Sequence, residues 1–338
     1  MMQYWIERAG SFDGIQMRDV PFPEPGPYEV VIRVHASSLN YRDLPIVLGS
    51  PIAPSAAVGR VPLSDGAGQI VAVGELVRGF AIGDRVAPIF RQNWLGGDMP
   101  PRAMQADLGG SRSGVLTEAM AINEEGLVHI PDSLSYVEAA TLPCAAVTAW
   151  HALHVGAPLL AGDTVLIQGS GGVALFALQL AKARGARVLA ISSSDEKAER
   201  LRALGADLVV NYTSVPDWDG PIRAATEGRG VDRVVEIGGA GTLQRSIRAT
   251  ALGGRIALVG ILAGRAAMDP SDIFFRRLNI HGISTGSRQM FIDMLKTMTA
   301  YQIRPVIDRV FEFERAIEAY RYFDRGVHFG KIAIDHKH

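Results

Sequence analysis

The stretch of residues 164–194, TVLIQGSGGVALFALQLAKARGARVLAISSS, decides the fold of this chain. An apolar strand over 165–167 leads into a glycine turn, then into a helix expected from Val173 to about Arg184, and then into a second strand over 187–191. Strand, tight turn, helix and strand at this spacing are typical of a mononucleotide-binding βαβ unit. The stretch therefore predicts a parallel α/β sheet that binds a dinucleotide at the turn.

The glycine turn is the expected pyrophosphate site. Gly169 can adopt turn dihedrals that are closed to other residues, Gly171 lets the backbone approach a ligand, and Ala174 lets helix and strand pack closely. The amides and the dipole at the helix N-terminus favour an anion there. A glycine turn that serves only packing is the alternative. The residues expected to contact the cofactor are Gly169, Ser170, Gly171, Gly172 and Val173.

The end of the second strand indicates which dinucleotide is bound. NAD sites usually place Asp or Glu there for the ribose 2'-hydroxyl, whereas this chain reads Ser192-Ser193-Ser194. Small hydroxyls can donate to a 2'-phosphate, and Lys197 can supply a cation beside it. The nearby Asp195 and Glu196 are interpreted as the first residues of the next helix, where acids are favoured. With Tyr212 as a further contact, the pattern predicts NADP(H) rather than NAD(H).

Composition limits the classes of function. The length of 338 residues predicts about two domains, and a net charge of −1 without a basic stripe argues against nucleic-acid binding. The N-terminus carries Glu7 and Arg8 and does not resemble a signal peptide. The most apolar stretch, 164–183, is broken by Gln168 and glycines, so no membrane span is expected. We therefore expect a soluble, cytoplasmic protein. Its single cysteine, Cys144, excludes an internal disulfide and a four-cysteine zinc site.

The pattern of elements changes near residue 150. Before it, short β-rich runs punctuated by Pro and Gly are typical of a partly open β-barrel. After it, strands and helices alternate as in a doubly wound parallel sheet. The expected strands are 165–167, 187–191, 208–210, 233–237, 255–261 and 278–283. The tail reads as helix 289–301, strand 310–313, helix 314–324 and strand 331–334, and we expect it to rejoin the N-terminal domain.

Five further motifs carry a resemblance to a known family: SLNYRD (38–43), PLSDGAG (62–68), GDRV (83–86), ATLPCAAVTAW (140–150) and FGK (329–331). With the glycine turn, they make nearly the whole chain similar to the medium-chain dehydrogenase/reductase superfamily. Within it, the chain resembles the zinc-free branch of quinone oxidoreductases and enoyl reductases. The resemblance implies a β-rich, GroES-like catalytic domain over 1–148 with 287–338, and a Rossmann domain that binds the nicotinamide cofactor over 149–286.

One departure from the family concerns zinc. Zinc-dependent members hold the catalytic metal with a cysteine, the histidine of a Gly-His-Glu motif and a second cysteine. These places fall on Asn40, Ser64 and Cys144 in this sequence. Because a catalytic zinc needs three protein ligands, no zinc is expected. Cys144 is interpreted as a small buried apolar residue beside the cleft rather than a catalytic one.

Without a Lewis acid, the expected chemistry is hydride transfer to a conjugated acceptor, a quinone or an α,β-unsaturated carbonyl. The resemblance implies that Asn40, Tyr41 and Arg42 line the nicotinamide and substrate cleft, while Asp43 holds the loop. As alternatives, Asn40 caps the turn, Tyr41 serves packing and Arg42 pairs with Asp43. The tyrosine donor of mitochondrial-type enoyl reductases is replaced by Pro51.

The resemblance also implies further contacts in the nucleotide-binding domain. Thr148 matches the residue that lies against the nicotinamide, and a hydroxyl bonded to its own helix is the alternative. The fourth and fifth strands end at Gly238, Val259 and Gly260. In a doubly wound sheet this edge binds the ligand.

Four more assignments stay open between ligand contact and structure. Ser287 follows the sixth strand and contacts either the cofactor or a neighbouring subunit. Lys331 either reaches the pyrophosphate or lies in solvent. Phe90 and Trp94 are expected as apolar walls of the substrate site, with simple packing as the alternative.

These observations favour an NADPH-dependent reductase of a small-molecule electron acceptor. The alternatives are a zinc-free alcohol or carbonyl dehydrogenase-reductase and a nucleotide-binding protein without turnover. The apolar strands 255–261 and 278–283 lie at one sheet edge if the usual strand order holds. Because such an edge invites pairing, we expect a homodimer.

Overall fold

The computed structural model describes residues 1–50, 57–262, 264 and 267–337. The chain divides into two compact units, one formed by residues 1–147 with 286–338 and the other by residues 148–285. The boundaries expected from the sequence lie one residue away from these. Pro51 falls outside the described residues.

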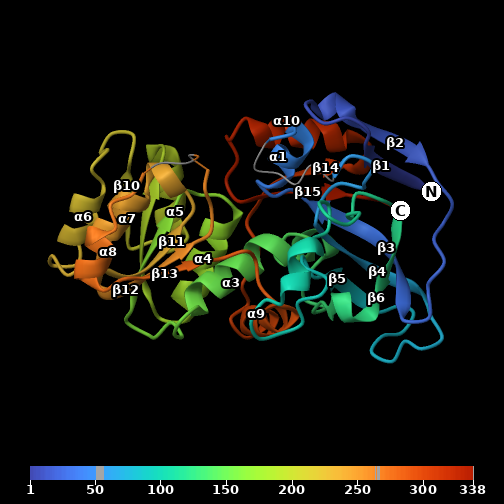
Figure 1. The fold of residues 1–338 in the computed structure, drawn as a ribbon, viewed down its shortest axis with the longest axis horizontal. Helices are drawn as coiled ribbons and strands as arrows, with labels where there is room; N and C mark the ends of the chain where they lie inside the picture. Colours follow the sequence, from blue (N-terminus) through green and yellow to red (C-terminus); the bar gives the residue numbers. More distant parts are fainter. Residues whose placement is uncertain (51–56, 263, 265–266, 338) are drawn as a thin grey trace. The chain divides into compact units, whose positions relative to one another are not determined.

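The second unit is built on a six-stranded parallel sheet (Figure 1). Its strands are β8 (Thr164–Gln168), β9 (Arg187–Ser192), β10 (Leu208–Asn211), β11 (Val231–Glu236), β12 (Thr250–Leu258) and β13 (Asn279–Gly282). Their order is β10-β9-β8-β11-β12-β13, so the chain starts in the middle, builds outward to one edge and then crosses to the other. This confirms the doubly wound parallel sheet.

Helices connect these strands. They are α4 (Gly172–Ala183), α5 (Asp195–Ala203), α6 (Asp219–Ala224), α7 (Leu243–Ala249) and α8 (Ser271–Arg276), while α3 (Val147–His154) precedes β8. The helix after the glycine turn and the helix opened by Asp195 begin within one residue of the sequence prediction. β12 begins at Thr250, which is earlier than predicted. Its pairing with β11 is interrupted between Thr250 and Arg255. Gly253 there has a φ of 74°, which breaks the alternation that the sequence reading used.

The first unit contains a two-stranded sheet and a seven-stranded sheet. The strands of the small sheet are β1 (Met2–Ile6) and β2 (Ile15–Asp19). Those of the large sheet are β3 (Glu29–Ser38), β4 (Asp65–Val73), β5 (Arg85–Pro88), β6 (Ala119–Asn123), β7 (Leu127–His129), β14 (Ile307–Glu312) and β15 (Lys331–Asp335). β15 pairs antiparallel with β3, so the tail rejoins the N-terminal part as expected.

The α-helices of this unit are α1 (Asp43–Leu48), α2 (Tyr136–Ala139), α9 (Arg288–Ala300) and α10 (Ala316–Asp324). α10 buries a stripe of residues at helical spacing against the core, namely Ala316, Ala319, Tyr320 and Phe323. A π-helical turn over Leu142–Ala146 carries Cys144. None of the helices in the described part of the chain combines the length and apolar character that crossing a membrane requires.

Candidate active site

The glycine turn lies at the carboxyl edge of the parallel sheet. Gly169 follows β8 with a φ of 73°, which favours glycine, and its N–H donates to Ile191 O at 2.8 Å. A side chain at Gly171 would meet open space, and no side chain caps the N-terminus of α4 there. The turn therefore offers free helix amides and room for close approach, as a pyrophosphate requires. Ser170, Gly172 and Val173 lie in the same turn.

A buried carboxylate that sequence reasoning missed shapes the neighbouring strand end. Glu236, at the end of β11, accepts the N–H groups of Gly238 and Gly239, both at 2.9 Å, through Oε1. Its Oε2 accepts from Gln168 Nε2 at 2.6 Å and from the Ser246 hydroxyl. Glu236 thus positions the Gly238 turn. The sequence did contain a signal for this contact, because a polar residue ends each of the two strands: Gln168 ends β8 and Glu236 ends β11.

The next strand ends beside this turn. Val259 and Gly260 both donate through their backbone N–H groups to Glu236 O. A Cβ at Gly260 would come within 2.4 Å of Ile237 O, so only glycine fits there. The structure therefore brings Gly238, Val259 and Gly260 together at the carboxyl edge that carries the glycine turn.

The serines after β9 have three different environments. Ser192 is fully buried, and its hydroxyl has no hydrogen-bond partner within the described residues. Ser193 is exposed, while Ser194 caps α5 by accepting the Lys197 N–H. Asp195 and Glu196 form the first turn of that helix, as predicted. Tyr212 is held beside Ser192 by a 2.9 Å bond from its N–H to Ser192 O.

In the first unit, the loop of residues 39–43 is held by Asp43. Its Oδ2 accepts the Asn40 N–H at 2.7 Å, and its own N–H donates to Asn40 O. Tyr41 is 53% exposed, so packing does not explain it. Asn40 does not cap the turn with its side chain, because its amide is bonded to Lys331 and Ser64 instead.

Arg42 has closer partners than Asp43, the residue with which the structural alternative pairs it. It donates to Asp107 Oδ2 at 2.5 Å and to Leu108 O at 2.7 Å, whereas its contact with Asp43 is 3.8 Å. Its guanidinium lies over the Phe90 ring, 4.8 Å from the centroid. Asp107 lies in a long loop whose contribution the sequence did not reveal.

The two aromatic residues expected as substrate walls are buried. Phe90 and Trp94 are both less than 5% exposed. Arg42 covers the ring of Phe90, and Trp94 donates through Nε1 to Gly97 O. Their assignment as substrate walls therefore stays a prediction, with packing as the alternative.

Lys331 occupies a position that neither expectation described. It is only 3% exposed, and its ammonium donates to Leu39 O at 2.5 Å and to Asn40 Oδ1 at 2.7 Å. The expectation of a solvated lysine is wrong, and both of these bonds lead to the Asn40 loop rather than to a pyrophosphate. Burial lowers the Lys331 pKa, with Asp65 nearby opposing that effect.

Ser64, Asp65 and Cys144 complete this cluster. Ser64 Oγ donates to Asp65 Oδ1 at 2.7 Å, and the Cys144 N–H donates to Asp65 Oδ2 at 2.9 Å. Asn40 Nδ2 lies 3.5 Å from Ser64 Oγ. Burial raises the pKa of the Cys144 thiol, and Asp65 adds to that effect, so the thiol is held in its unreactive form.

The two remaining residues that were expected to contact the cofactor or a neighbouring subunit are both buried. Thr148 is buried in α3, and Ser287 is buried and caps α9 by accepting the Met290 N–H at 3.2 Å.

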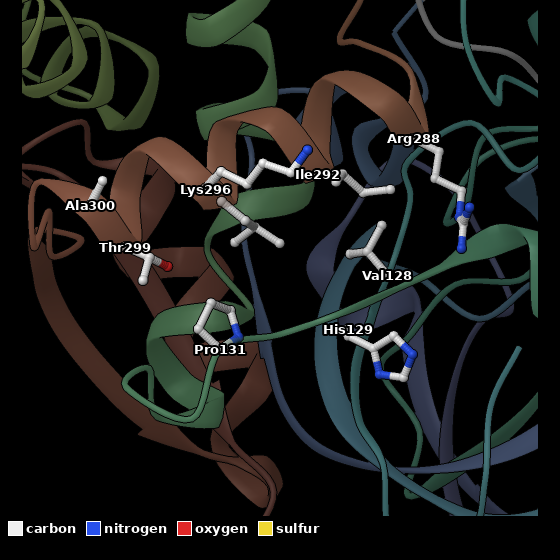
Figure 2. Close-up of a pocket in the computed structure, with 9 residues that line it drawn as sticks. Val128, His129, Pro131, Arg288, Ile292, Lys296, Thr299 and Ala300 are labelled. Atoms are coloured by element: carbon white, nitrogen blue, oxygen red, sulfur yellow. The ribbon is translucent and has the colours of Figure 1, made fainter.

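A groove of about 570 Å³ lies between α9 and β7, where Ile292 and Val128 point toward one another (Figure 2). Its lining shares no residue with the Asn40 cluster, so it does not mark the candidate site.

Comparison with known proteins agrees with this architecture. The family profile described as alcohol dehydrogenase GroES-like domain matches residues 26–132, and the profile described as zinc-binding dehydrogenase matches residues 172–300. The zinc-type alcohol dehydrogenase-like protein C1773.06c of Schizosaccharomyces pombe is 41% identical over 97% of both chains. The chain belongs to the medium-chain dehydrogenase/reductase superfamily.

Two further members of the superfamily differ in what their names say they do. The 2-methylene-furan-3-one reductase of Solanum lycopersicum is 31% identical, over 96% of this chain and 76% of that protein. A solved NAD-dependent alcohol dehydrogenase is 34% identical, with a TM-score of 0.90 and full coverage of both chains. This chain is therefore an oxidoreductase of the superfamily, whose members include both kinds.

The donor set at the superfamily's metal position does not fit zinc. Asn40 Oδ1 already accepts from Lys331 and Ser64 Oγ donates to Asp65, so Cys144 is the one usual zinc ligand among these three residues. The buried Lys331 ammonium also repels a dication.

Proposed function

We propose that this protein is an NADPH-dependent reductase that transfers a hydride to a quinone or an α,β-unsaturated carbonyl without zinc. The observation that carries the proposal is the bond between Lys331 and Asn40. Asn40, which matches the position of a cysteine ligand in zinc-dependent members, carries an amide whose oxygen accepts from the buried Lys331 ammonium. Such a site can stabilise charge through hydrogen bonds but cannot act as a Lewis acid.

The chemistry of the acceptor follows from this limit. When bound, the nicotinamide supplies a hydride. In an enone the hydride adds at the β-carbon, the alkene electron pair moves to the oxygen as an enolate, and a proton from water completes the α-carbon. Asn40 Nδ2 and the Tyr41 hydroxyl are the candidate donors to that oxygen, while Asp43 holds their loop. Charge spread along a conjugated system needs only a few such donors.

The preference for NADPH is supported by the residues after β9. Ser193 is exposed at the strand end, and no carboxylate stands at residues 192–194; Ser192 lies buried beside it, with no hydrogen-bond partner for its hydroxyl in the described residues. A carboxylate there would repel a 2'-phosphate, whereas hydroxyls donate to it. Lys197 and Tyr212 lie on the two segments that flank these serines. The glycine turn after β8 would hold the pyrophosphate.

A second candidate is an alcohol or carbonyl dehydrogenase-reductase. The observation that favours it is the similarity to the NAD-dependent alcohol dehydrogenase, at 34% identity over the whole chain. That reaction would run readily in reverse on a simple alcohol. The similarity to the tomato enone reductase favours the leading proposal to a comparable extent.

The deciding experiment measures cofactor oxidation with 1,4-benzoquinone, 2-cyclohexen-1-one and cyclohexanone, each with NADPH or NADH and with or without EDTA. We expect NADPH oxidation with the first two acceptors, unchanged by EDTA, and almost no reduction of NADP by cyclohexanol. Fast, reversible oxidation of cyclohexanol would favour the second candidate. Tight cofactor binding without turnover on any acceptor would instead support the third alternative, a nucleotide-binding protein without catalytic activity.

A further inference from the structure

We propose that Lys331 is a positioning residue that fixes the Asn40 amide with its N–H₂ group as the donor of the site. The inference rests on the proposed function and deepens it, because it names how an amide can serve at this position. It begins from a simple asymmetry. An ammonium has three donors and no acceptor, so the Asn40 atom 2.7 Å from Lys331 Nζ must be the carbonyl oxygen.

The orientation of the amide follows from that contact. A flipped Asn40 would place its N–H₂ group against an ammonium, with two donors facing each other and no acceptor. Nδ2 therefore faces away from Lys331, toward Ser64 Oγ at 3.5 Å. Ser64 spends its own hydroxyl proton on Asp65, so its oxygen can only accept from Asn40.

Lys331 itself cannot move easily. Its ammonium makes a second bond to Leu39 O, and the residue is almost fully buried. Pairing of β15 with β3, with Ala333 opposite Ser38, sets Lys331 beside the residues that follow β3. Leu39 N also donates to Ile332 O at 3.1 Å. The backbone pairing of β15 with β3 thus fixes the position of the Lys331 side chain beside Asn40.

The amide keeps donor capacity for a ligand. Nδ2 carries two hydrogens, and its contact within the described residues is the long one to Ser64 Oγ. A donor whose carbonyl accepts from a cation is polarised, so its hydrogen bond to a developing enolate oxygen is strengthened. The positive charge then acts on the acceptor through Asn40 without touching it. Asp65, which faces the ammonium, compensates the buried charge.

The test is a double-mutant cycle with 1,4-benzoquinone and saturating NADPH. We expect Asn40→Ala to lower kcat by about 10²–10³, the usual loss for one such donor, and Lys331→Met to lower it by about tenfold or more. The double variant should be no slower than Asn40→Ala alone, because Lys331 acts only through that amide. Lys337→Met, which removes an exposed lysine six residues on, should leave kcat unchanged. Multiplying effects, or unchanged turnover in Lys331→Met, would overturn the proposal.

A second variant covers loss of folding in Lys331→Met. Asn40→Asp keeps an acceptor for Lys331 and removes the donor, so it should retain the native melting temperature and lose turnover as severely as Asn40→Ala. Native turnover in Asn40→Asp would contradict the role of the amide.

The amide orientation has a readout that does not need turnover. The side-chain amide signals of Asn40 in a ¹⁵N-correlation spectrum, identified by their loss in Asn40→Asp, should shift in Lys331→Met and stay in place in Lys337→Met. Signals unchanged in Lys331→Met would refute the proposal even in an active enzyme. Conversely, a shift in a protein that reduces none of the acceptors would support the amide orientation while the proposed function fails.

Discussion

The carboxylate of Asp43 accepts the backbone N–H of Asn40 at 2.7 Å through Oδ2, while its Oδ1 is buried without a hydrogen-bond partner in the described residues. Burial raises the Asp43 pKa to about 6, and the neighbouring Arg42 opposes this rise only in part. The residue that holds the candidate donor loop is therefore destabilised in its charged form.

The raised pKa predicts that Asp43 makes the free energy of unfolding depend on pH. Between its unfolded pKa of 3.8 and its folded pKa of about 6, the folded state binds the proton more tightly. Its stabilising effect is therefore complete below about pH 4 and is lost as the pH rises to about 6. A rise of about two units at 1.36 kcal/mol each is about 3 kcal/mol.

The measurement is the free energy of unfolding of the wild type and of Asp43→Asn at several pH values. We expect the difference between the two to move against the wild type by about 2 kcal/mol from pH 4 to 6.5. Asp98→Asn, at an exposed position, is the control and should show no such trend. A difference that is constant with pH would show that Asp43 is not perturbed.

Cofactor choice should depend on Lys197. NADPH should bind more tightly than NADH, and Lys197→Ala should narrow that gap by about tenfold or more, because a hydrogen bond to a charged group contributes about 1.5–3 kcal/mol. Titration calorimetry gives both dissociation constants. Lys182→Ala, which removes a lysine paired with Asp207, is the matched control. Equal affinities of the wild type for both cofactors would rule out the prediction.

Metal content should be negligible. Because Asn40 and Ser64 are engaged with Lys331 and Asp65, purified protein should carry no stoichiometric zinc, and EDTA should leave NADPH oxidation unchanged. Elemental analysis on the same sample settles the point. One tightly held zinc per chain, lost together with activity, would contradict the interpretation of this cluster.

Tyr41 should affect turnover rather than binding. Its side chain is 53% exposed next to Asn40, so Tyr41→Phe removes a hydroxyl without leaving a cavity. If that hydroxyl stabilises the developing enolate or quinol anion, kcat should fall by about 10²–10³ with little change in NADPH affinity. Tyr28→Phe, at another exposed tyrosine, is the control. Unchanged turnover would remove Tyr41 from the mechanism.

A homodimer is expected through the edge of the parallel sheet. β13 is the terminal strand of that sheet, and the neighbouring helix α8 exposes Phe274 by 76% and Phe275 by 74%. An edge strand next to such rings invites a symmetric partner. Sedimentation should show a dimer at micromolar concentration that dissociates in Phe274→Asp. Leu160→Asp, at another exposed apolar residue, should stay dimeric; a monomeric wild type would refute the prediction.

The sequence by itself determined the elements and the fold class. Residues 164–183 contain an apolar run, a glycine turn and an amphipathic helix. They predict the central βαβ unit because each of these signals depends only on residues that are close together in the sequence. The start of α5 at Asp195 follows from local capping in the same way. Strand ends such as that of β12 were less predictable, since a glycine at positive φ interrupts the alternation.

Only the tertiary structure decided which polar groups meet. Lys331 and Asn40 are 291 positions apart, and nothing local to FGK predicts that its lysine is buried against SLNYRD. The register of β15 on β3 brings them together, and register depends on how whole faces pack. For the same reason the closest carboxylate to Arg42 is that of Asp107, 65 positions away, rather than that of its neighbour Asp43. Periodicity specifies elements locally, whereas a buried charge takes whichever partner the completed fold places within reach.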